Sequence, residues 1–385
     1  MQTEGRRNFL KASGGVLLLK PQTVFGSQAN STVEFGVVGC GGRGVYITNH
    51  FHEHTLARIV ACADPFQDRL DGSRDKFKLD PKRLYGGLNG FRELAESKLD
   101  AVVIESPPYF HPEQAEAAVN AGKHVFMAKP VAVDVFGCNR VTAAAARAKG
   151  KTTFWVDFQT RASPAFRDAA SRVHGGDIGK VVFGHVYYHS RRNAGHDVTG
   201  MPASRGRLRN WLHDKQLSGD IIVEQNIHVL DCFNWYAQSH PLQAVGIGGQ
   251  SARRVGDVWD NFIVAYTYPN DVRVDFSSTQ FLEGYGDLCI RVYGTDGTLD
   301  SHYGGYLKIT GKKPWPGVEK DNTFHGGATE NVNSVRSGQN INNGDVGADS
   351  ALTAVLGRMA AHSGKPLSWA EMMRSNDRID VKLAI

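Results

Sequence analysis

Three side chains in the second half of the chain have types and a spacing that suit proton transfer. Glu224, His228 and Asp231 are four and three residues apart, so on one helix they would share a face. A neutral histidine can take the proton of a hydroxyl group while a hydride leaves the same carbon, because its unperturbed pKa lies near neutral pH. Glu224 could orient that imidazole or bind a hydroxyl group of the substrate. The spacing also allows a metal site or a purely structural histidine, so these residues by themselves leave the chemistry open.

A glycine-rich segment in the first half has the spacing of a dinucleotide-binding loop. It follows a strand-like run at 33–38 and precedes a predicted helix at 45–54. In such a loop Gly39 permits the tight turn, Gly41 lets the backbone approach a pyrophosphate, and Gly44 allows the helix to pack closely on the strand. The pyrophosphate would lie at the N-terminus of the helix, where unpaired N–H groups favour an anion. The residues predicted to bind the nucleotide here are Gly39, Gly41, Gly42, Arg43 and Gly44.

An acidic residue indicates which dinucleotide to expect. Asp64 ends a second strand-like run at 57–63 and lies twenty residues after Gly44. A carboxylate there accepts hydrogen bonds from the adenosine ribose hydroxyls and repels a 2′-phosphate. The predicted cofactor is therefore NAD rather than NADP.

Strands and helices alternate along the rest of the first half. Strands are predicted at 99–104 and 124–127, and helices at 112–121 and 136–148. This alternation indicates a parallel, doubly wound sheet, in which ligands bind beyond the carboxyl ends of the strands. The residues expected there on the cofactor side are Ser106, Pro107, His111 and Lys129.

These segments resemble the Gfo/Idh/MocA family of sugar and cyclitol oxidoreductases. The resemblance implies an α/β protein with an N-terminal Rossmann domain at 30–150 and a C-terminal α+β domain at 151–385. The second domain is expected to contain a large, open, mostly antiparallel sheet, and the helix at 348–363 is expected to pack back on the first domain. The stretches that carry the resemblance are GVVGCGGRG (36–44), DAVVIESPPYFHPEQAEAAVNAGKHVFMAKP (100–130), SGDIIVEQNIHVLD (218–231) and GADSALTAVLGRMAAHSGKPLSW (347–369).

The resemblance also implies roles for the candidate site residues. Lys129 is expected to reach the nicotinamide ribose and the substrate hydroxyl, and His228 is expected to be the catalytic base, with Glu224 as the acid four residues before it. We therefore predict Lys129, His228 and Glu224 to be catalytic, and we predict no metal. The chain departs from the family at Ala128, where glutamate is usual. The carboxylate that normally precedes the lysine is thus missing.

After residue 150, strand-like runs follow one another with few helices between them. They occur at 181–190, 242–249, 262–268, 272–280 and 288–293. Such runs indicate a mostly antiparallel sheet, and the resemblance implies that one face covers the nicotinamide while the other forms a homo-oligomer. Aromatic and hydrogen-bonding side chains suit the ring faces and hydroxyl groups of carbohydrates. The predicted substrate-binding residues are Lys129, Arg191, Trp211, Glu224 and His228.

The first residues of the chain have the pattern of an export signal. Arg6-Arg7 precede an apolar stretch at 16–19 and small residues at 27–29, so we predict a twin-arginine signal at 1–29. Its removal would lower the net charge from +5 to about +2, which does not suggest a nucleic-acid surface. No apolar run approaches the ~20 residues needed for membrane insertion. The five cysteines are expected to be reduced thiols in the core.

An exported enzyme of this kind cannot draw on the cytoplasmic NAD pool. We therefore expect NAD to be bound tightly and returned to its starting state in each cycle while a hydroxyl of a sugar or glycoside is oxidised. A redox-assisted glycoside hydrolase, working by oxidation, elimination, hydration and reduction, is one alternative. Others are a cytoplasmic sugar or inositol dehydrogenase with no export, and a non-catalytic nucleotide-binding sensor, which would have no need of Lys129 and His228 together.

Overall fold

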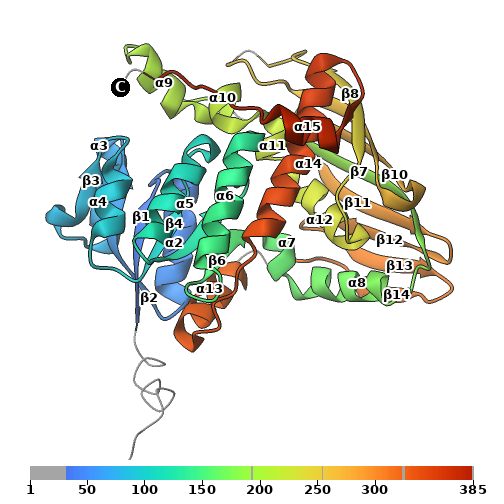
Figure 1. Ribbon diagram of the computed structural model, residues 1–385, viewed down its shortest axis with the longest axis horizontal. Helices are drawn as coiled ribbons and strands as arrows, with labels where there is room; N and C mark the ends of the chain where they lie inside the picture. The colour runs from blue at the N-terminus through green and yellow to red at the C-terminus, as the bar shows by residue number, and fades with distance from the viewer. Residues whose placement is uncertain (1–31, 192–193, 254, 323–325, 384–385) are drawn as a thin grey trace, which may run out of the picture. The chain divides into compact units, whose positions relative to one another are not determined.

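Two β-sheets organise the part of the chain that the structure describes (Figure 1). The structure is a computed structural model, and it describes residues 32–191, 194–253, 255–322 and 326–383. The predicted signal at 1–29, with Arg6-Arg7, lies outside these residues. Val33–Ile385 form one unit of mutually contacting elements.

The first sheet is parallel, with the strand order β3-β2-β1-β4-β5-β6. The order reverses between β1 and β4, which is where doubly wound sheets bind their ligands. The predicted parallel sheet is thus confirmed. Its strands are β1 Val33–Val38, β2 Ala57–Asp64, β3 Leu84–Gly86, β4 Ala101–Ile104, β5 His124–Ala128 and β6 Phe154–Asp157.

The last strand of this sheet lies beyond residue 150, where we placed the end of the first domain. β6 pairs with β5 throughout its length, so the sheet continues to Asp157. A run of four residues is too short to separate from a loop by its periodicity, which is why the sequence did not predict it.

Helices connect the parallel strands, as expected for crossover connections. Helix α6 illustrates the local reasons: the Asp134 side chain accepts a hydrogen bond from the Gly137 backbone N–H at 2.7 Å, and Val135, Cys138 and Val141 bury one face at a spacing of three. The helices of this half are α2 Gly42–His54, α3 Gln67–Phe77, α4 Gly90–Glu96, α5 His111–Asn120 and α6 Val135–Ala148, with 3-10 turns η1 Pro81–Arg83 and η2 Pro108–Phe110.

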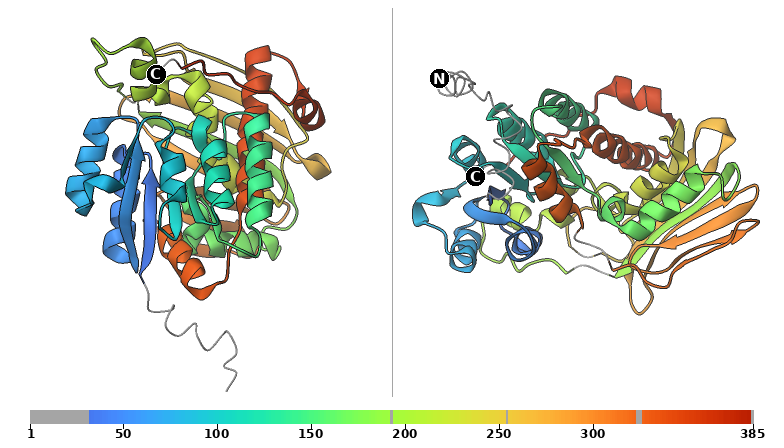
Figure 2. Two further views of the ribbon diagram at one scale, coloured as in Figure 1. Left: turned by 60° about the vertical axis from the view of Figure 1, so that its left-hand side comes forward. Right: turned by 90° about the horizontal axis from the view of Figure 1, so that it is seen from below.

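The second sheet has nine strands in the order β14-β13-β12-β11-β7-β10-β9-β8-β15 and is antiparallel except for the pair β7 and β10. The predicted open, mostly antiparallel sheet is confirmed. Figure 2 shows helices against one of its faces. Its strands are β7 Val181–Arg191, β8 Gln243–Gly249, β9 Asn261–Thr267, β10 Arg273–Leu282, β11 Asp287–Gly294, β12 Gly297–His302, β13 Leu307–Gly311, β14 Trp315–Val318 and β15 Leu367–Ser368.

A buried helix, α14, contacts both halves. It packs against α6 and against β8, and it approaches the first half so closely that a Cβ atom at Gly344 would overlap Ala145. The helices of this half are α7 Gln159–Ala162, α8 Pro164–His174, α9 Ala203–Arg209, α10 Lys215–Ser218, α11 Ile221–Glu224, α12 Ile227–Ala237, α13 Gly326–Ser337, α14 Gly344–Ser363 and α15 Trp369–Ser375, with η3 Trp211–His213 and η4 Pro269–Asp271.

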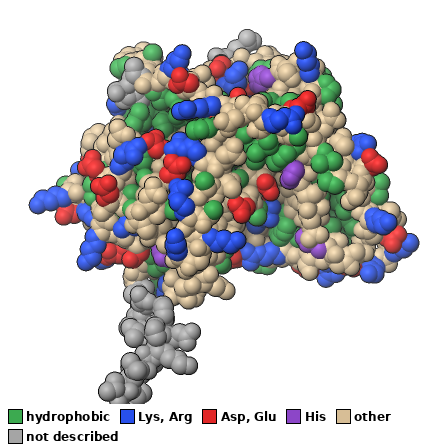
Figure 3. Space-filling model, viewed as in Figure 1, with side chains coloured by type: hydrophobic (Ala, Val, Ile, Leu, Met, Phe, Trp, Pro, Cys, Tyr) green, Lys and Arg blue, Asp and Glu red, His purple; other side chains and the backbone are tan. Residues whose placement is uncertain are grey.

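The cysteines, the surface charges and the apolarity of the helices can be compared with the expectations from the sequence. All five cysteines lie in the described part of the chain and are buried free thiols. Acidic and basic side chains are interspersed over the face shown in Figure 3. Among the helices that the structure describes, none combines the length and the apolarity needed to cross a bilayer.

Candidate active site

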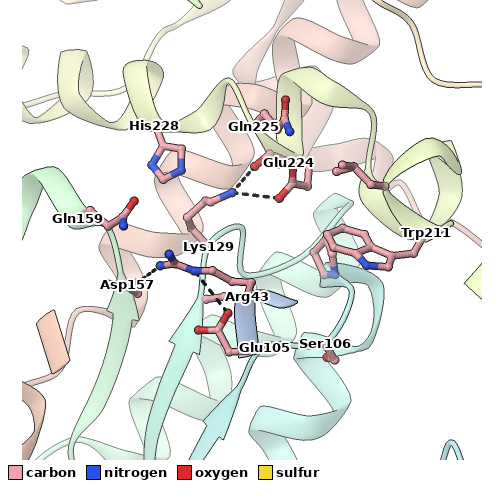
Figure 4. Close-up of a pocket in the computed structure, with 13 residues that line it drawn as sticks. Arg43, Glu105, Ser106, Lys129, Asp157, Gln159, Trp211, Glu224, Gln225 and His228 are labelled. Atoms are coloured by element: carbon pink, nitrogen blue, oxygen red, sulfur yellow. Dashed lines mark hydrogen bonds and ion pairs between the residues drawn. The ribbon is translucent and has the colours of Figure 1, made fainter. Parts of the chain in front are cut away.

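A cavity of about 280 Å³ lies beyond the carboxyl ends of β4, β5 and β6 (Figure 4). The strand ends form one wall, and residues of α11, α12 and η3 face them. This is the edge of the sheet where the sequence predicted the cofactor. The side chains that line the cavity are Arg43, Glu105, Ser106, Pro108, Ala128, Lys129, Asp157, Gln159, Trp211, Leu212, Glu224, Gln225 and His228.

The glycine-rich loop beside this cavity has the shape that a pyrophosphate requires. Gly39 has φ +94°, and a Cβ atom at Gly44 would overlap the Gly39 carbonyl oxygen, so both positions need glycine. At Gly42, by contrast, a Cβ atom would meet nothing within 4 Å. Helix α2 begins there with no side-chain cap and no acidic residue in its first turn, which leaves its first N–H groups available to an anion. These residues fit the cofactor that the sequence predicted.

Asp64 lies at the end of β2, as expected, and it also holds the loop in place. One carboxylate oxygen accepts from the Cys40 backbone N–H at 2.8 Å, and the other accepts from the Phe66 backbone N–H at 2.8 Å. The Arg69 guanidinium is 3.9 Å from Asp64 and lies against Gly41. The predicted hydrogen bond to the adenosine ribose would use lone pairs that these backbone bonds leave available.

Lys129 and Glu224 come together in the cavity although 95 residues separate them. Lys129 follows β5 and Glu224 ends α11, and the Lys129 Nζ donates to Glu224 Oε1 at 3.1 Å and to the Glu224 carbonyl oxygen. Both side chains are nearly buried, with 14% and 11% exposed. Glu224 Oε2 has no hydrogen-bond partner among the described residues. The lysine therefore has a carboxylate partner despite Ala128, and that partner comes from the second half of the chain.

His228 lines the same cavity from α12. Its ring lies 5.2 Å from that of Tyr303, and its Nδ1 is buried without a partner in the described structure. Burial first, and then the positive charges of Lys129 and Arg43, lower the pKa of His228 well below its usual value. The imidazole is therefore neutral at neutral pH, which is the form that can accept a proton.

The predicted helical face through Glu224, His228 and Asp231 is wrong in its last member. The helix is interrupted after Glu224, where the Asn226 N–H donates to the carbonyl of Ile221, five residues back instead of four. This wider turn separates Glu224 in α11 from His228 and Asp231 in α12, and of the three only Glu224 and His228 line the cavity.

Asp231 has a structural role. It forms a bidentate ion pair with Arg161 at 2.9–3.0 Å and accepts from Ser350 Oγ at 2.6 Å, with no exposed surface. A site that uses all three residues of the original pattern is excluded by this pairing.

Three charged residues at the floor of the cavity complete the site. Arg43 Nη2 donates to Asp157 Oδ2 at 3.0 Å, and Arg43 Nε lies 3.9 Å from Glu105 Oε2. We predicted Arg43 as a nucleotide contact, but sequence reasoning missed Glu105 and Asp157. For Glu105 the available signal was an acidic residue directly after a predicted strand, as at Asp64. Asp157 ends β6, a strand that the sequence did not predict.

The remaining predicted residues differ in where they lie. Ser106 and Trp211 line the cavity, whereas Pro107 precedes η2 and is not part of the lining. His111 is buried with Nδ1 2.7 Å from the Pro130 carbonyl oxygen and Nε2 2.8 Å from that of Ser106, and burial lowers its pKa to about 4. Since a neutral imidazole has one N–H group, His111 donates to one of these two carbonyl groups, and it does not line the cavity. Arg191 is exposed at the end of β7, outside the cavity.

Comparison with known proteins decides the family. Residues 33–158 match the model of an oxidoreductase family with an NAD-binding Rossmann fold, and residues 166–300 match the C-terminal domain of GFO/IDH/MocA proteins. The chain belongs to the Gfo/Idh/MocA family of oxidoreductases. The predicted resemblance, the NAD cofactor and the oxidoreductase class are thereby confirmed.

Individual relatives are distant. Inositol 2-dehydrogenase of Acidothermus cellulolyticus is 25% identical over 280 residues, which cover 70% of this chain and 72% of the relative. The 2,7-anhydro-N-acetylneuraminate hydratase of Mediterraneibacter gnavus is also 25% identical, over 73% of this chain and 71% of the relative. The crystal structure of aldose-aldose oxidoreductase from Caulobacter crescentus superposes with a TM-score of 0.72 at 18% identity, covering 88% of this chain and 99% of that one. This last likeness concerns the fold alone.

Proposed function

We propose that this oxidoreductase uses NAD to oxidise a secondary hydroxyl group of a sugar, cyclitol or glycoside, and that it returns the cofactor to its starting state within each cycle. The observation that carries the proposal is the convergence of Lys129, Glu224 and His228 in one cavity next to the Gly39–Gly44 loop. When bound, the cofactor would accept a hydride. The chain's own residues must then bind the substrate hydroxyl and take its proton.

The geometry suits that division of work. Neutral His228 can accept the hydroxyl proton, since its Nδ1 has no partner among the described residues. Lys129, fixed by Glu224, presents a positive charge that stabilises an alkoxide as the proton leaves. Trp211 provides an apolar surface on the opposite side of the cavity (Figure 4), which suits the apolar face of a sugar ring.

Redox-neutral turnover is proposed because of the predicted export. Outside the cytoplasm the enzyme must keep the NAD with which it folded. For an association rate of about 10⁶ M⁻¹s⁻¹, retention over many hours needs a Kd near 10 pM, or about −15 kcal/mol.

Nucleotide analysis tests this proposal directly. The purified protein is denatured and the released nucleotide is measured by mass spectrometry; we expect close to one NAD per chain after extensive dialysis. Single-turnover absorbance with a panel of glycosides and cyclitols should then show NADH formed and consumed. Protein that is free of nucleotide after dialysis, and that produces net NADH with added NAD, would refute the redox-neutral cycle and leave an ordinary dehydrogenase.

A second candidate is redox-assisted elimination and hydration of the sugar. Transient oxidation acidifies the C–H bond next to the new ketone, and a leaving group can then depart. Such a cycle needs a second proton-handling group, and buried Glu105 in the cavity wall favours this candidate. Exchange of the substrate's carbon-bound hydrogen with deuterated water, without net NADH, would separate elimination from simple hydride shuttling.

Export itself is proposed from Arg6-Arg7 together with the apolar stretch at 16–19 and the small residues at 27–29. Replacing both with lysine should leave the protein in the cytoplasmic fraction with residues 1–29 attached, because twin-arginine signals are read by a receptor. Full-length, unaltered protein in the cytoplasm would refute export.

A homo-oligomer through the outer face of the second sheet is also part of the proposal. Val245, Ile247 and Ile263 point outward from β8 and β9 with 43–64% of their surface exposed, and Ile247 pairs directly with Ile263. Apolar patches of this kind mark interaction surfaces. Ile247→Glu together with Ile263→Glu should dissociate the assembly in analytical ultracentrifugation, and an unchanged mass would refute this interface.

A further inference from the structure

The ends of three neighbouring strands bring two carboxylates to either side of Ala128. Ile104 of β4 pairs with Met127 of β5, so the next residue, Glu105, lies alongside Ala128. On the other side Asp157 of β6 pairs with Ala128 directly. Arg43 bridges the two carboxylates, as Figure 4 shows. The small side chain of Ala128 leaves this space to the guanidinium group.

Arg43 contacts Asp157 more closely than Glu105. It donates a hydrogen bond to Asp157 at 3.0 Å, but its nearest approach to Glu105 is an ion-pair distance of 3.9 Å. The Glu105 side chain is 1% exposed, and its Oε1 is buried without a partner among the described residues. Glu105 is therefore the less well compensated charge of the pair, and it lines the cavity in which the chemistry is expected.

The surroundings of Glu105 favour its protonated form at neutral pH more than those of an ordinary carboxylate. Burial raises the pKa of Glu105 to about 7; Arg43 and Lys129 oppose the shift, and Asp157 adds to it. The nearby histidines do not add charge. His228 and His111 both have lowered pKa values because they are buried, so both are neutral at pH 7.

We propose that Glu105 stores the substrate proton inside the site while the hydride resides on the cofactor. The inference rests on the proposed function. The C–H bond breaks with its electron pair going to the nicotinamide, and the O–H proton passes through His228 or Lys129 to the Glu105 carboxylate, which becomes a carboxylic acid. The return half-reaction reverses both transfers, so hydride and proton leave the site together on the product.

Charge balance is the physical reason. Reduction removes one positive charge from the nicotinamide, and protonation removes one negative charge from Glu105, so the net charge of the buried site stays constant. The other groups are poorer stores. A charged His228 would face Lys129 and Arg43, and Asp157 is already bonded to Arg43. Lys129 holds its own proton in the bond to Glu224.

Proton counting tests the proposal. A single turnover of NAD reduction by substrate is followed in weakly buffered solution near pH 7, with NADH absorbance and a pH-indicator dye recorded together. The wild-type holoenzyme should release well under one proton per NADH formed, and Glu105→Gln should release about one. Exposed Glu93 on α4 offers the matched control, so Glu93→Gln should retain the wild-type ratio. A wild-type ratio of one, or a ratio that Glu105→Gln leaves unchanged, would overturn the proposal.

An infrared titration separates this inference from the proposed function. Unaltered holoenzyme titrated between pH 5 and 9, around the value of about 7 for Glu105, should show the C=O stretch of one buried carboxylic acid that disappears near neutrality. Glu105→Gln should lack it. If no substrate reduces the bound NAD, the proposed function fails, but the infrared titration still tests Glu105. Absence of the C=O band would overturn its role in storing the proton.

Discussion

Replacing Lys129 tests whether the Lys129–Glu224 pair is catalytic or only structural. Lys129→Met keeps most of the length of the side chain but removes its charge, so Glu224 would remain buried with no cation beside it. Breaking such a pair from one side typically costs about 3–5 kcal/mol of stability. The pair is 14% and 11% exposed, so we expect the lower part of that range. If Lys129 also acts on the substrate hydroxyl, the rate of bound-NAD reduction should fall by ~10²–10⁴-fold, which is about 3–5 kcal/mol of barrier.

The double variant Lys129→Met with Glu224→Gln separates the two effects. It removes the uncompensated carboxylate while keeping its shape, so the free energy of unfolding in urea should return most of the way to the wild-type value. Single-turnover stopped-flow absorbance, at equal NAD occupancy, should still show the full rate loss. Recovery of the rate along with stability would mean that Lys129 acts only by holding Glu224, and the catalytic assignment would be wrong.

Three further predictions concern the loop, the cofactor and pH. Gly44→Ala should abolish NAD retention and lower stability by about 1–3 kcal/mol, because its Cβ atom would overlap a loop carbonyl. Nucleotide analysis measures the retained NAD, and thermal melts measure the stability. The control is Gly72→Ala, in open space on α3, which should leave NAD retention and stability intact. Asp64→Asn should narrow the preference for NAD over NADP in calorimetric titrations of the nucleotide-free protein, since a repulsive charge is lost. Equal affinities of the unaltered protein for NAD and NADP would contradict the role of Asp64 in selecting NAD. Burial lowers the pKa of His302, but the hydrogen bonds to the two carboxylates beside it outweigh this effect and raise the pKa to about 10. This value is above the unfolded value of about 6.5. The contribution of His302 to the free energy of unfolding is therefore full below pH 6.5 and is lost as the pH rises through 10. Urea unfolding across this range should show that loss in the wild-type protein but not in His302→Gln.

The sequence alone was sufficient for features that depend on neighbouring residues. The loop from Gly39 to Gly44 needs glycine for local backbone reasons, and its position between a strand and a helix can be read directly. The same holds for the alternation that predicts the parallel sheet. Because parallel strands end at one edge of a sheet, that alternation also places Lys129 near the cofactor.

Only the tertiary structure shows which side chains contact the candidate site residues. The helix pattern placed Asp231 with Glu224 and His228, but in the fold the Asp231 carboxylate pairs with Arg161 and accepts from Ser350. Periodicity cannot reveal this pairing, because Arg161 and Ser350 lie 70 and 119 residues from Asp231 in the chain.

The charge balance of the site was equally hidden. The missing carboxylate at Ala128 indicated a lysine without its usual partner. In the fold, Glu224 supplies that partner across 95 residues, while Glu105 and Asp157 flank Ala128 from the adjacent strands. Strand pairing and the packing of α11 on the sheet edge bring these groups together. Such contacts join segments far apart in the chain, so they depend on the whole fold and not on any local sequence pattern.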